Sequence, residues 1–232
     1  MSKVTITYAG AKGTGKTFSS FLVKGNKLVV SYDGKAERIW VYFFNSTPEI
    51  KIINGIELYD RTPEQMVPTS IENFKHIMSQ IVESAGEFDW IIHDGLDTLA
   101  ELVEMGMRAE FKLKPFQGFA EKSYWKYRRV LLSNRHRKSI ESARKGVIYN
   151  TYLTQVDEEI IDGEVVRRKT VPRWFDVVET ETDVLFKTDI RKIKDDTRFF
   201  LSVVTSKIPK WLTGAELDVT MKVPQSSEGK EV

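Results

Sequence analysis

Apolar residues recur along the chain in two patterns, one that predicts strands and one that predicts helices. Short runs of β-branched and aromatic residues, such as 3–9 and 27–33, predict buried strands. From Thr69 or Ser70 to about Ala85 the apolar positions recur at helical spacing, which predicts an amphipathic helix. Strands alternate with helices in the first two thirds of the chain and follow one another in the last third. This order predicts an α/β fold with a mostly parallel sheet, helices on both faces and an antiparallel C-terminal edge.

The remaining elements follow from the same patterns. Between the two long helices lies a loop, and Asp162-Gly163 favours a tight turn in a β-hairpin. We expect an irregular β-rich stretch at 39–44 and 50–60, strands at 88–94, 146–154, 183–190 and 198–205, and helices at 16–23, 96–113 and 121–143.

The composition limits the classes of protein and of site. The chain has 232 residues, of which 41% are hydrophobic, enough for one core; we expect one domain over 1–222 and a polar tail over 223–232. Absence of cysteine excludes disulfides, thiolate zinc sites and a cysteine nucleophile. No window approaches the roughly eighteen apolar residues of a membrane span, so we expect a cytoplasmic protein without a membrane partner. A net charge of +2 does not by itself require a nucleic-acid partner.

The stretch YAGAKGTGKTFSS carries the most specific motif. Its spacing fits G-x-x-x-x-G-K-[ST], in which backbone N–H groups surround the phosphates of a nucleotide and the lysine reaches the terminal ones. A predicted strand precedes the motif and a predicted helix follows it, so the helix N-terminus adds N–H groups and a positive dipole end. We therefore expect a nucleotide to be bound by Gly10, Ala11, Lys12, Gly13, Thr14, Gly15, Lys16, Thr17 and Phe18.

A second part of a nucleotide site lies at the end of the strand 88–94. This apolar strand ends on Asp94 and is followed by a glycine and a long helix. An aspartate in this position holds Mg²⁺ opposite the threonine of the phosphate loop. We therefore expect Thr17 and Asp94 to form the metal site.

Five segments, in this order, resemble the RecA-like branch of the P-loop ATPases over residues 3–214: AGAKGTGKT, LVVSYDG, DWIIHDGLDTL, VIYNTYLTQ and FFLSVVTSKIPKWLTG. The chain is similar in particular to the short single-domain RecA-like ATPases of phages, archaeal viruses and plasmids, which are associated with DNA recombination and single-strand annealing. The resemblance implies a three-layer α/β/α fold and Mg²⁺-dependent hydrolysis of ATP to ADP and phosphate. It also implies action on single-stranded DNA, in the host cytoplasm if the protein is viral.

The resemblance implies roles for individual residues. Lys16 binds the β and γ phosphates, and Asp94 completes the metal site. Asp33 takes the place of the carboxylate that orients the attacking water, where the family usually has glutamate; a residue that only starts a turn is the alternative. Gln155 ends a strand where the family often has a polar residue that senses the γ-phosphate, or it is an ordinary strand-end amide.

Two basic segments are candidates for partner contacts. Lys207 and Lys210 loosely match a segment from which RecA-like subunits present lysines to a neighbour's phosphates, which implies a homo-oligomer, ring or filament; two solvated lysines are the alternative. Arg167, Arg168 and Lys169 follow the hairpin where RecA-like proteins place DNA-binding loops. Trp174 and Phe175 lie nearby and either stack on bases or pack in the core. The helix 121–143 is unusually basic, but its cations are not all on one face: Arg128, Arg129, Arg135, Arg137 and Lys138.

Three alternative functions use the same phosphate loop. A nucleotide or small-molecule kinase needs a lid, for which Arg135, His136 and Arg137 are the one cluster. A partition-type ATPase needs a further lysine where this chain has Ala11. A binding-only module keeps the nucleotide as a structural ligand, which the lack of a water-activating carboxylate would favour.

Overall fold

The computed structural model describes residues 2–55, 63–114, 117–118, 122–161, 164–173, 176–194, 196–209 and 212–220. Five residues for which the sequence makes predictions lie outside these ranges, as does the tail 223–232: Asp162, Gly163, Trp174, Phe175 and Lys210. In the part of the chain that is described, no helix is long and apolar enough to cross a bilayer.

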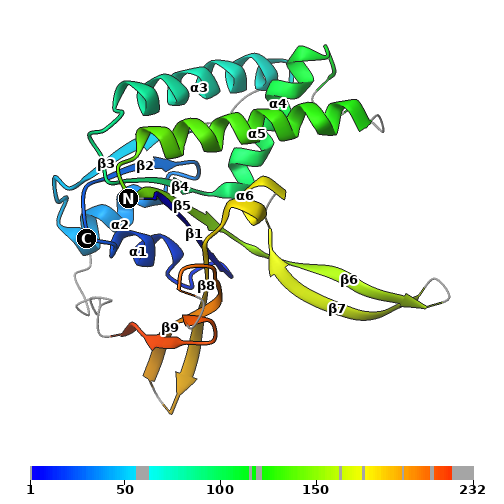
Figure 1. The fold of residues 1–232 in the computed structure, drawn as a ribbon. Helices are drawn as coiled ribbons and strands as arrows, with labels where there is room; N and C mark the ends of the chain where they lie inside the picture. Colours follow the sequence, from blue (N-terminus) through cyan, green and yellow to red (C-terminus); the bar gives the residue numbers. More distant parts are fainter. Residues whose placement is uncertain are drawn as a thin grey trace, which may run out of the picture.

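The centre of the protein is an eight-stranded sheet in the order β10-β9-β8-β1-β5-β4-β2-β3 (Figure 1). The six strands from β8 to β3 are parallel, whereas β9 is antiparallel to β8 and β10 is antiparallel to β9. The strands are β1 (Val4–Gly10), β2 (Lys27–Ser31), β3 (Ile50–Asn54), β4 (Trp90–Asp94), β5 (Gly146–Thr151), β8 (Val184–Ile193), β9 (Asp196–Ser206) and β10 (Glu216–Asp218).

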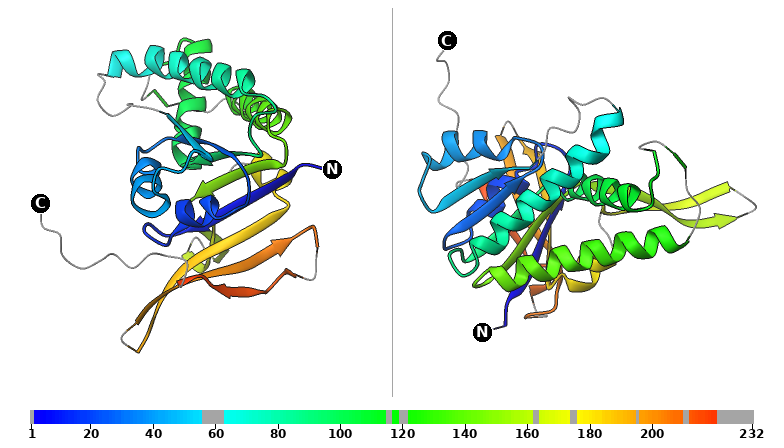
Figure 2. Two further views of the ribbon diagram at one scale, coloured as in Figure 1. Left: turned by 90° about the vertical axis from the view of Figure 1, so that its left-hand side faces the viewer. Right: turned by 90° about the horizontal axis from the view of Figure 1, so that it is seen from above.

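Helices cover both faces of the sheet, as Figures 1 and 2 show. On one face lie α3 (Pro63–Glu83), α4 (Leu96–Glu110) and α5 (Lys122–Ser142), and on the other lie α1 (Lys16–Phe21) and α2 (Ala36–Phe44). A short helix, α6 (Asp176–Glu181), precedes β8.

Alternate residues of the buried strands supply the two cores. In β2, Leu28 and Val30 pack with the residues of α3, α4 and α5, whereas Val29 belongs to the core on the side of α1 and α2. Side chains of a strand point alternately to its two faces, so a fully apolar strand must be covered on both sides. The structure confirms the predicted three-layer α/β/α fold class with antiparallel C-terminal strands and a hairpin.

The expectation of a β-rich stretch at 39–44 was wrong, because this segment is the helix α2. Val41 and Tyr42 are exposed, at 48% and 75%, whereas Ile39, Trp40 and Phe44 pack against the core. With Ala36, these core-facing positions recur every three to four residues, which fits a helix and not a strand. Aromatic and β-branched residues favour strands, but packing on the sheet overrides this weak preference.

A two-stranded sheet of β6 (Leu153–Ile161) and β7 (Glu164–Pro172) projects from the body of the protein (Figure 1). The sequence predicted one strand over 146–154, but β5 ends at Thr151 and the chain leaves the central sheet at Tyr152. Gln155 therefore lies within the hairpin, opposite Thr170, and the prediction that it ends a strand of the central sheet was wrong.

Candidate functional site

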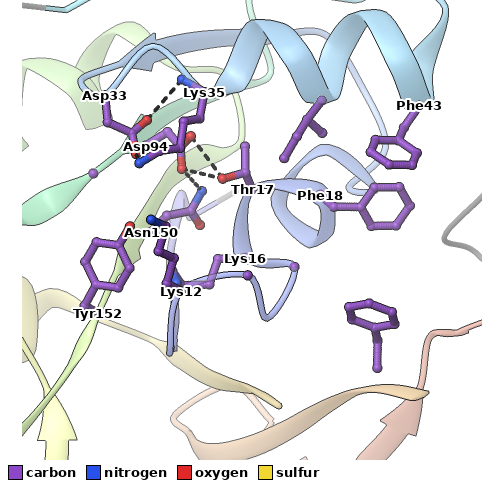
Figure 3. Close-up of a pocket in the computed structure, with 15 residues that line it drawn as sticks. Lys12, Lys16, Thr17, Phe18, Asp33, Lys35, Phe43, Asp94, Asn150 and Tyr152 are labelled. Carbon is purple, nitrogen blue, oxygen red and sulfur yellow. Dashed lines mark hydrogen bonds and ion pairs between the residues drawn. The ribbon is translucent and has the colours of Figure 1, made fainter. Parts of the chain in front are cut away.

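A cavity of about 360 Å³ opens at the carboxyl ends of the parallel strands. The loop after β1 and the residues that follow β2, β4 and β5 all border it, because parallel strands end at the same edge of a sheet. Figure 3 shows its polar half, around Lys16, Thr17 and Asp94. Ligands of open α/β sheets bind at such an edge.

The loop between β1 and α1 has the backbone conformation that its glycines permit. Gly13 and Gly15 have φ values of 81° and 84°, in the left-handed region that favours glycine. At Gly10 a side chain is excluded by space, because a Cβ atom there would lie 2.0 Å from the hydroxyl of Thr188. The backbone of the phosphate loop thus requires glycine at these three positions of the motif.

The predicted nucleotide-binding residues divide into two groups in the structure. The cavity is lined by Lys12, Gly13, Gly15, Lys16, Thr17 and Phe18. Gly10, Ala11 and Thr14 do not line it. The Thr14 hydroxyl instead contacts that of Thr188 at 2.6 Å and donates to the carbonyl of Ala11 at 2.8 Å, which ties the loop to β8.

Lys16 projects into the cavity from the first turn of α1 (Figure 3). Its Nζ donates to the carbonyl oxygens of Gly10 and Ala11 at 2.9 and 2.7 Å and lies 4.3 Å from the centre of the Tyr152 ring. Burial lowers the pKa of Lys16 to about 8, although nearby carboxylates, Asp94 first, oppose this shift. Lys16 is therefore mostly protonated at neutral pH, and its charge is available to an anion.

Thr17, Asp94 and Asn150 form a connected polar group beside Lys16 (Figure 3). The Thr17 hydroxyl donates to both oxygens of Asp94, at 2.9 and 3.0 Å, and the Asn150 amide donates to Asp94 Oδ1 at 2.7 Å. Burial raises the pKa of Asp94 to about 6, against the opposing effect of the hydrogen bonds from Asn150 and Thr17. Oδ1 of Asn150 is buried without a hydrogen-bond partner.

These oxygen atoms are suitable ligands for Mg²⁺. A hydroxyl and a carboxylate are hard donors, and Mg²⁺ takes its remaining ligands from water and from the phosphates of a substrate. Among the described residues, no three His, Cys, Asp or Glu side chains lie together as a protein-only metal site. The arrangement therefore fits a metal that is held jointly by Thr17, Asp94 and a bound nucleotide.

Asp33 and Lys35 border the cavity from the segment between β2 and α2. Lys35 Nζ lies 2.5 Å from Asp33 Oδ2, and this hydrogen bond is the main reason why the pKa of Lys35 is raised. Both side chains are partly exposed, so the carboxylate of Asp33 is accessible to water. The sequence placed Asp33 here and missed Lys35, which no motif marks.

The carboxylates of Asp97 and Glu37 follow β4 and β2, but neither lines the cavity. Asp97, in the first turn of α4, lies 3.2 Å from Arg173 and accepts the N–H of Tyr152 at 3.3 Å. Burial raises the pKa of Asp97. Glu37 does not line the cavity, and both of its carboxylate oxygens are buried without a hydrogen-bond partner. Asp33 is thus the more accessible carboxylate of the cavity.

The other half of the cavity is apolar. Phe18 from α1 packs edge-on against Phe43 from α2, with ring centres 5.7 Å apart, and Ile39 lies on the same helix. Phe199 from β9 also lines the cavity and approaches Gly15, so that a Cβ there would lie 3.7 Å from its ring. The sequence predicted Phe18 and missed the other three, because they come from elements that only the fold brings together.

The residues predicted to bind DNA lie on β7, away from the cavity. Each is ion-paired with a carboxylate of β6: Arg167 with Glu158 at 2.9 Å, Arg168 with Asp157 at 3.0 Å, and Lys169 with Glu158 at 3.8 Å. All three cations are exposed. The hairpin thus pairs its positive charges with its own negative ones.

Two further predicted site residues lie outside the cavity. Gln155 is exposed on β6 and does not line it. Nζ of Lys207 donates to the carbonyl of Thr180 at 2.7 Å, so this lysine is held by its own chain near α6. No contact in the described part of the chain brings either side chain to Lys16 or Asp94.

A buried hydrogen-bond network lies directly behind the cavity. Tyr32, His93 and Tyr149 immediately precede Asp33, Asp94 and Asn150, and their side chains point away from the cavity toward α5. Tyr32 bonds to His93 at 2.9 Å and accepts from Arg135 at 2.9 Å. His93 bonds to Ser139 at 3.0 Å, and Tyr149 bonds to His136 at 2.9 Å. Burial, with the nearby Arg135 charge, holds the pKa of His93 well below its usual value.

This network overturns one sequence interpretation. Arg135 and His136, which a kinase would use in a lid, are 1% and 8% exposed and face the sheet. A lid must close over a substrate from solvent, so these two residues are not a lid.

Comparisons with known proteins add only distant likenesses. No protein-family model and no curated protein matches the sequence. Solved structures with a similar fold include a KaiC-like protein from the archaeon Pyrococcus horikoshii, which is 12% identical with a TM-score of 0.49. This match covers 93% of the present chain and 84% of the other. The flagellar accessory protein FlaH from Methanocaldococcus jannaschii is 13% identical with a TM-score of 0.41, covering 91% and 81%.

Proposed function

We propose that this protein is a P-loop ATPase of the RecA-like class, which binds Mg²⁺-ATP and hydrolyses it to ADP and phosphate. The observation that carries the proposal is the Thr17–Asp94 hydrogen bond beside Lys16, at the end of a glycine loop. A loop that binds phosphate, a cation and an oxygen metal site are the three parts that phosphoryl transfer requires.

The two halves of the cavity bind different parts of the nucleotide. The loop N–H groups and Lys16 hold the phosphates, and Thr17 and Asp94 hold Mg²⁺, which neutralises charge on the phosphate oxygens when bound. Asn150 fixes the orientation of Asp94 through its amide. The aromatic half, with Phe18, Phe43 and Phe199, receives the base by stacking.

Asp33 is the residue that we assign to the attacking water. Its carboxylate borders the cavity and accepts a proton from the water as the bond between oxygen and the γ phosphorus forms. The bond from phosphorus to the bridging oxygen breaks, and ADP leaves. Lys35 holds the Asp33 carboxylate at 2.5 Å and places a second positive charge at this side of the cavity.

The proposal includes a DNA partner and a homo-oligomer. The resemblance to RecA-like ATPases of mobile elements supports both, with a function in recombination, annealing, repair or replication. Lys207 and Lys210 are proposed to act on the phosphates of a neighbouring subunit, where Lys207 exchanges its contact with the Thr180 carbonyl for a phosphate oxygen. Such contacts stabilise the transition-state charge only in an assembly, so hydrolysis is expected to rise with protein concentration.

ATP hydrolysis measured over a range of protein concentrations, with and without single-stranded DNA, tests this proposal. We expect Mg²⁺-dependent turnover that rises more than linearly with protein concentration and rises further with DNA. ATP binding without any turnover under all these conditions would instead support a binding-only module. Transfer of the γ-phosphate to a small-molecule acceptor would support a kinase.

A further inference from the structure

Four exposed positive residues, here called the stripe, lie along the outward side of α5. Lys122, Lys126, Arg129 and Arg137 follow one another at spacings of four, three and eight residues, and all four are exposed. With 3.6 residues per turn these positions lie on one side of the helix. From Lys122 to Arg137 the helix rises through fifteen residue steps, or about 22 Å at 1.5 Å per step.

Within α5, positive charges outnumber negative ones. The helix contains seven lysines and arginines and one acidic residue, Glu141. Glu141 lies 3.7 Å from Arg137, and both side chains are about two-thirds exposed, so this pair is weak. The sequence alone did not separate the outward cations from Arg135, which is buried, and from Arg128, which is paired with Glu104 at 3.3 Å.

The β6–β7 hairpin, in contrast, has little net positive charge around Arg167, Arg168 and Lys169. Arg167, Arg168 and Lys169 share two carboxylates at 2.9 to 3.8 Å. A polyanion that approaches them also approaches Asp157 and Glu158, which repel it. A nucleic-acid backbone is attracted by the net local charge, so α5 is the more favourable surface.

We propose that the outward face of α5 binds the sugar–phosphate backbone of a nucleic-acid strand. This inference rests on the DNA partner of the proposed function but moves the contact from the hairpin to α5. Trp125 is 45% exposed and lies one helical turn from both Lys122 and Arg129. The Arg128 guanidinium lies over its ring, 4.3 Å from the centroid. An aromatic side chain among cations is typical of single-strand binding surfaces.

The distribution of apolar residues on α5 favours a nucleic acid over a membrane. Helices that lie on membranes present a wide apolar face beside their basic residues. In α5, Leu131, Leu132 and Ile140 pack against the core, and the exposed large apolar side chains are those of Trp125 and Val130. The outward face is therefore mostly charged or polar.

The inner face of α5 is anchored behind the nucleotide cavity. Arg135, His136 and Ser139 bond to the residues that immediately precede Asp33, Asn150 and Asp94, as described above. A strand bound to the outward face would therefore lie one helix away from the site of hydrolysis.

Fluorescence anisotropy of a labelled thirty-nucleotide oligo-dT, titrated at several salt concentrations with ATP and Mg²⁺ present, tests the inference. The variant Lys122→Glu/Lys126→Glu should bind at least about tenfold more weakly. Its salt slope should fall by about 1.4, because each lost phosphate contact on a single strand accounts for about 0.7. Lys24→Glu/Lys51→Glu is the matched control, since both lysines are exposed and the net charge changes equally. It should bind within about twofold of the parent.

Other outcomes would overturn the inference in recognisable ways. If Arg167→Glu/Arg168→Glu abolishes binding while the α5 variant binds normally, the surface is the hairpin and the DNA partner stands. If the parent protein hydrolyses ATP but binds no oligonucleotide, the inference and the DNA partner both fail while the ATPase stands. Stripe-dependent binding to phosphatidylserine vesicles without oligonucleotide binding would assign α5 to a membrane. The neutral variant Lys122→Gln/Lys126→Gln, with its thermal unfolding curve, excludes loss of the fold as the cause.

Discussion

The hydroxyl of Thr17 donates to both carboxylate oxygens of Asp94, although the two residues are 77 positions apart in the chain. The contact joins the helix after the phosphate loop to the end of β4. The contact holds the buried carboxylate of Asp94 in place. Burial disfavours the ionised form of this carboxylate, as its raised pKa of about 6 indicates. A buried carboxylate that lowers stability when it is ionised, and that nevertheless accepts hydrogen bonds from two side chains, is typical of a functional site.

Asp94→Asn is expected to make the protein more stable and to impair the proposed function. An acid whose folded pKa lies above its unfolded value loses stability as pH rises from about 4 to about 6, so the neutral amide avoids this loss at pH 7. We expect a free energy of unfolding higher by roughly 1–3 kcal/mol, measured by urea denaturation without nucleotide. Stabilisation by added Mg²⁺-ATP should be largely lost.

Asp89→Asn is the control of opposite sign. Burial raises the pKa of Asp89, but Lys145 and Arg144 outweigh this effect and the net shift is downward, so its charged form stabilises the fold. We expect this variant to be less stable at pH 7 and to respond to Mg²⁺-ATP like the parent. A destabilised Asp94→Asn variant with a normal response to Mg²⁺ would assign Asp94 a purely structural role.

The affinity for ATP in the absence of Mg²⁺ should fall above pH 8. Lys16 has a pKa of about 8 and must be protonated to attract the phosphates, so the association constant should drop by up to about tenfold per pH unit beyond that value. Calorimetric titration from pH 6.5 to 9.5 measures this fall. Lys16→Arg should abolish it, because a guanidinium stays charged over the whole range.

Asp33→Asn should lower turnover by about a hundredfold and leave the affinity for ATP unchanged, because a general base acts on the reaction more than on binding. The measurement is the kcat and the KM of phosphate release. Lys35→Met is the companion variant, since it removes the ion-pair partner and leaves the carboxylate in place. If Asp33→Asn turns over at the parent rate, Asp97 and Glu37 are the next carboxylates to test.

Phe199→Ala should weaken nucleotide binding by about five- to tenfold, because an aromatic stacking partner contributes about 1 kcal/mol. The dependence on Mg²⁺ should not change, since Phe199 lies in the apolar half of the cavity. Competition between ATP and a fluorescent analogue measures the affinity. Phe200→Leu, at the neighbouring buried position on β9, controls for a general loss of packing around this strand. Equal affinities of parent and Phe199→Ala would show that the base binds elsewhere.

The sequence predicted those parts of the site that depend on local geometry. The phosphate loop needs glycines at fixed positions, and Asp94 follows an apolar strand that has to end at the same sheet edge as β1. Asn150 was missed, although it lies in register with Asp94 in the neighbouring strand. The sequence predicted a strand that continues to Thr154, whereas β5 ends at Thr151, directly after Asn150. Pairing of strands, and not any motif, brings Asn150 to Asp94.

The sequence also misjudged residues whose environment depends on packing. Arg135 looked like a surface cation but is buried behind Tyr32, and the aromatic run of α2 looked like a strand. The ion pairs of Arg167 to Lys169 could not be predicted from the sequence because their carboxylate partners lie on the opposite strand of the hairpin. In each case a long-range contact decides the role of the residue.

Phosphate release by the parent protein and by Lys16→Ala, assayed side by side at pH 7.5 with and without Mg²⁺, tests the central claim most directly. Removal of the ammonium leaves the phosphates without their main cationic contact and does not disturb the apolar core. The account predicts Mg²⁺-dependent turnover by the parent, a loss of at least about a hundredfold in the variant, and an unchanged unfolding transition. Parent-level turnover in a folded Lys16→Ala protein would contradict it.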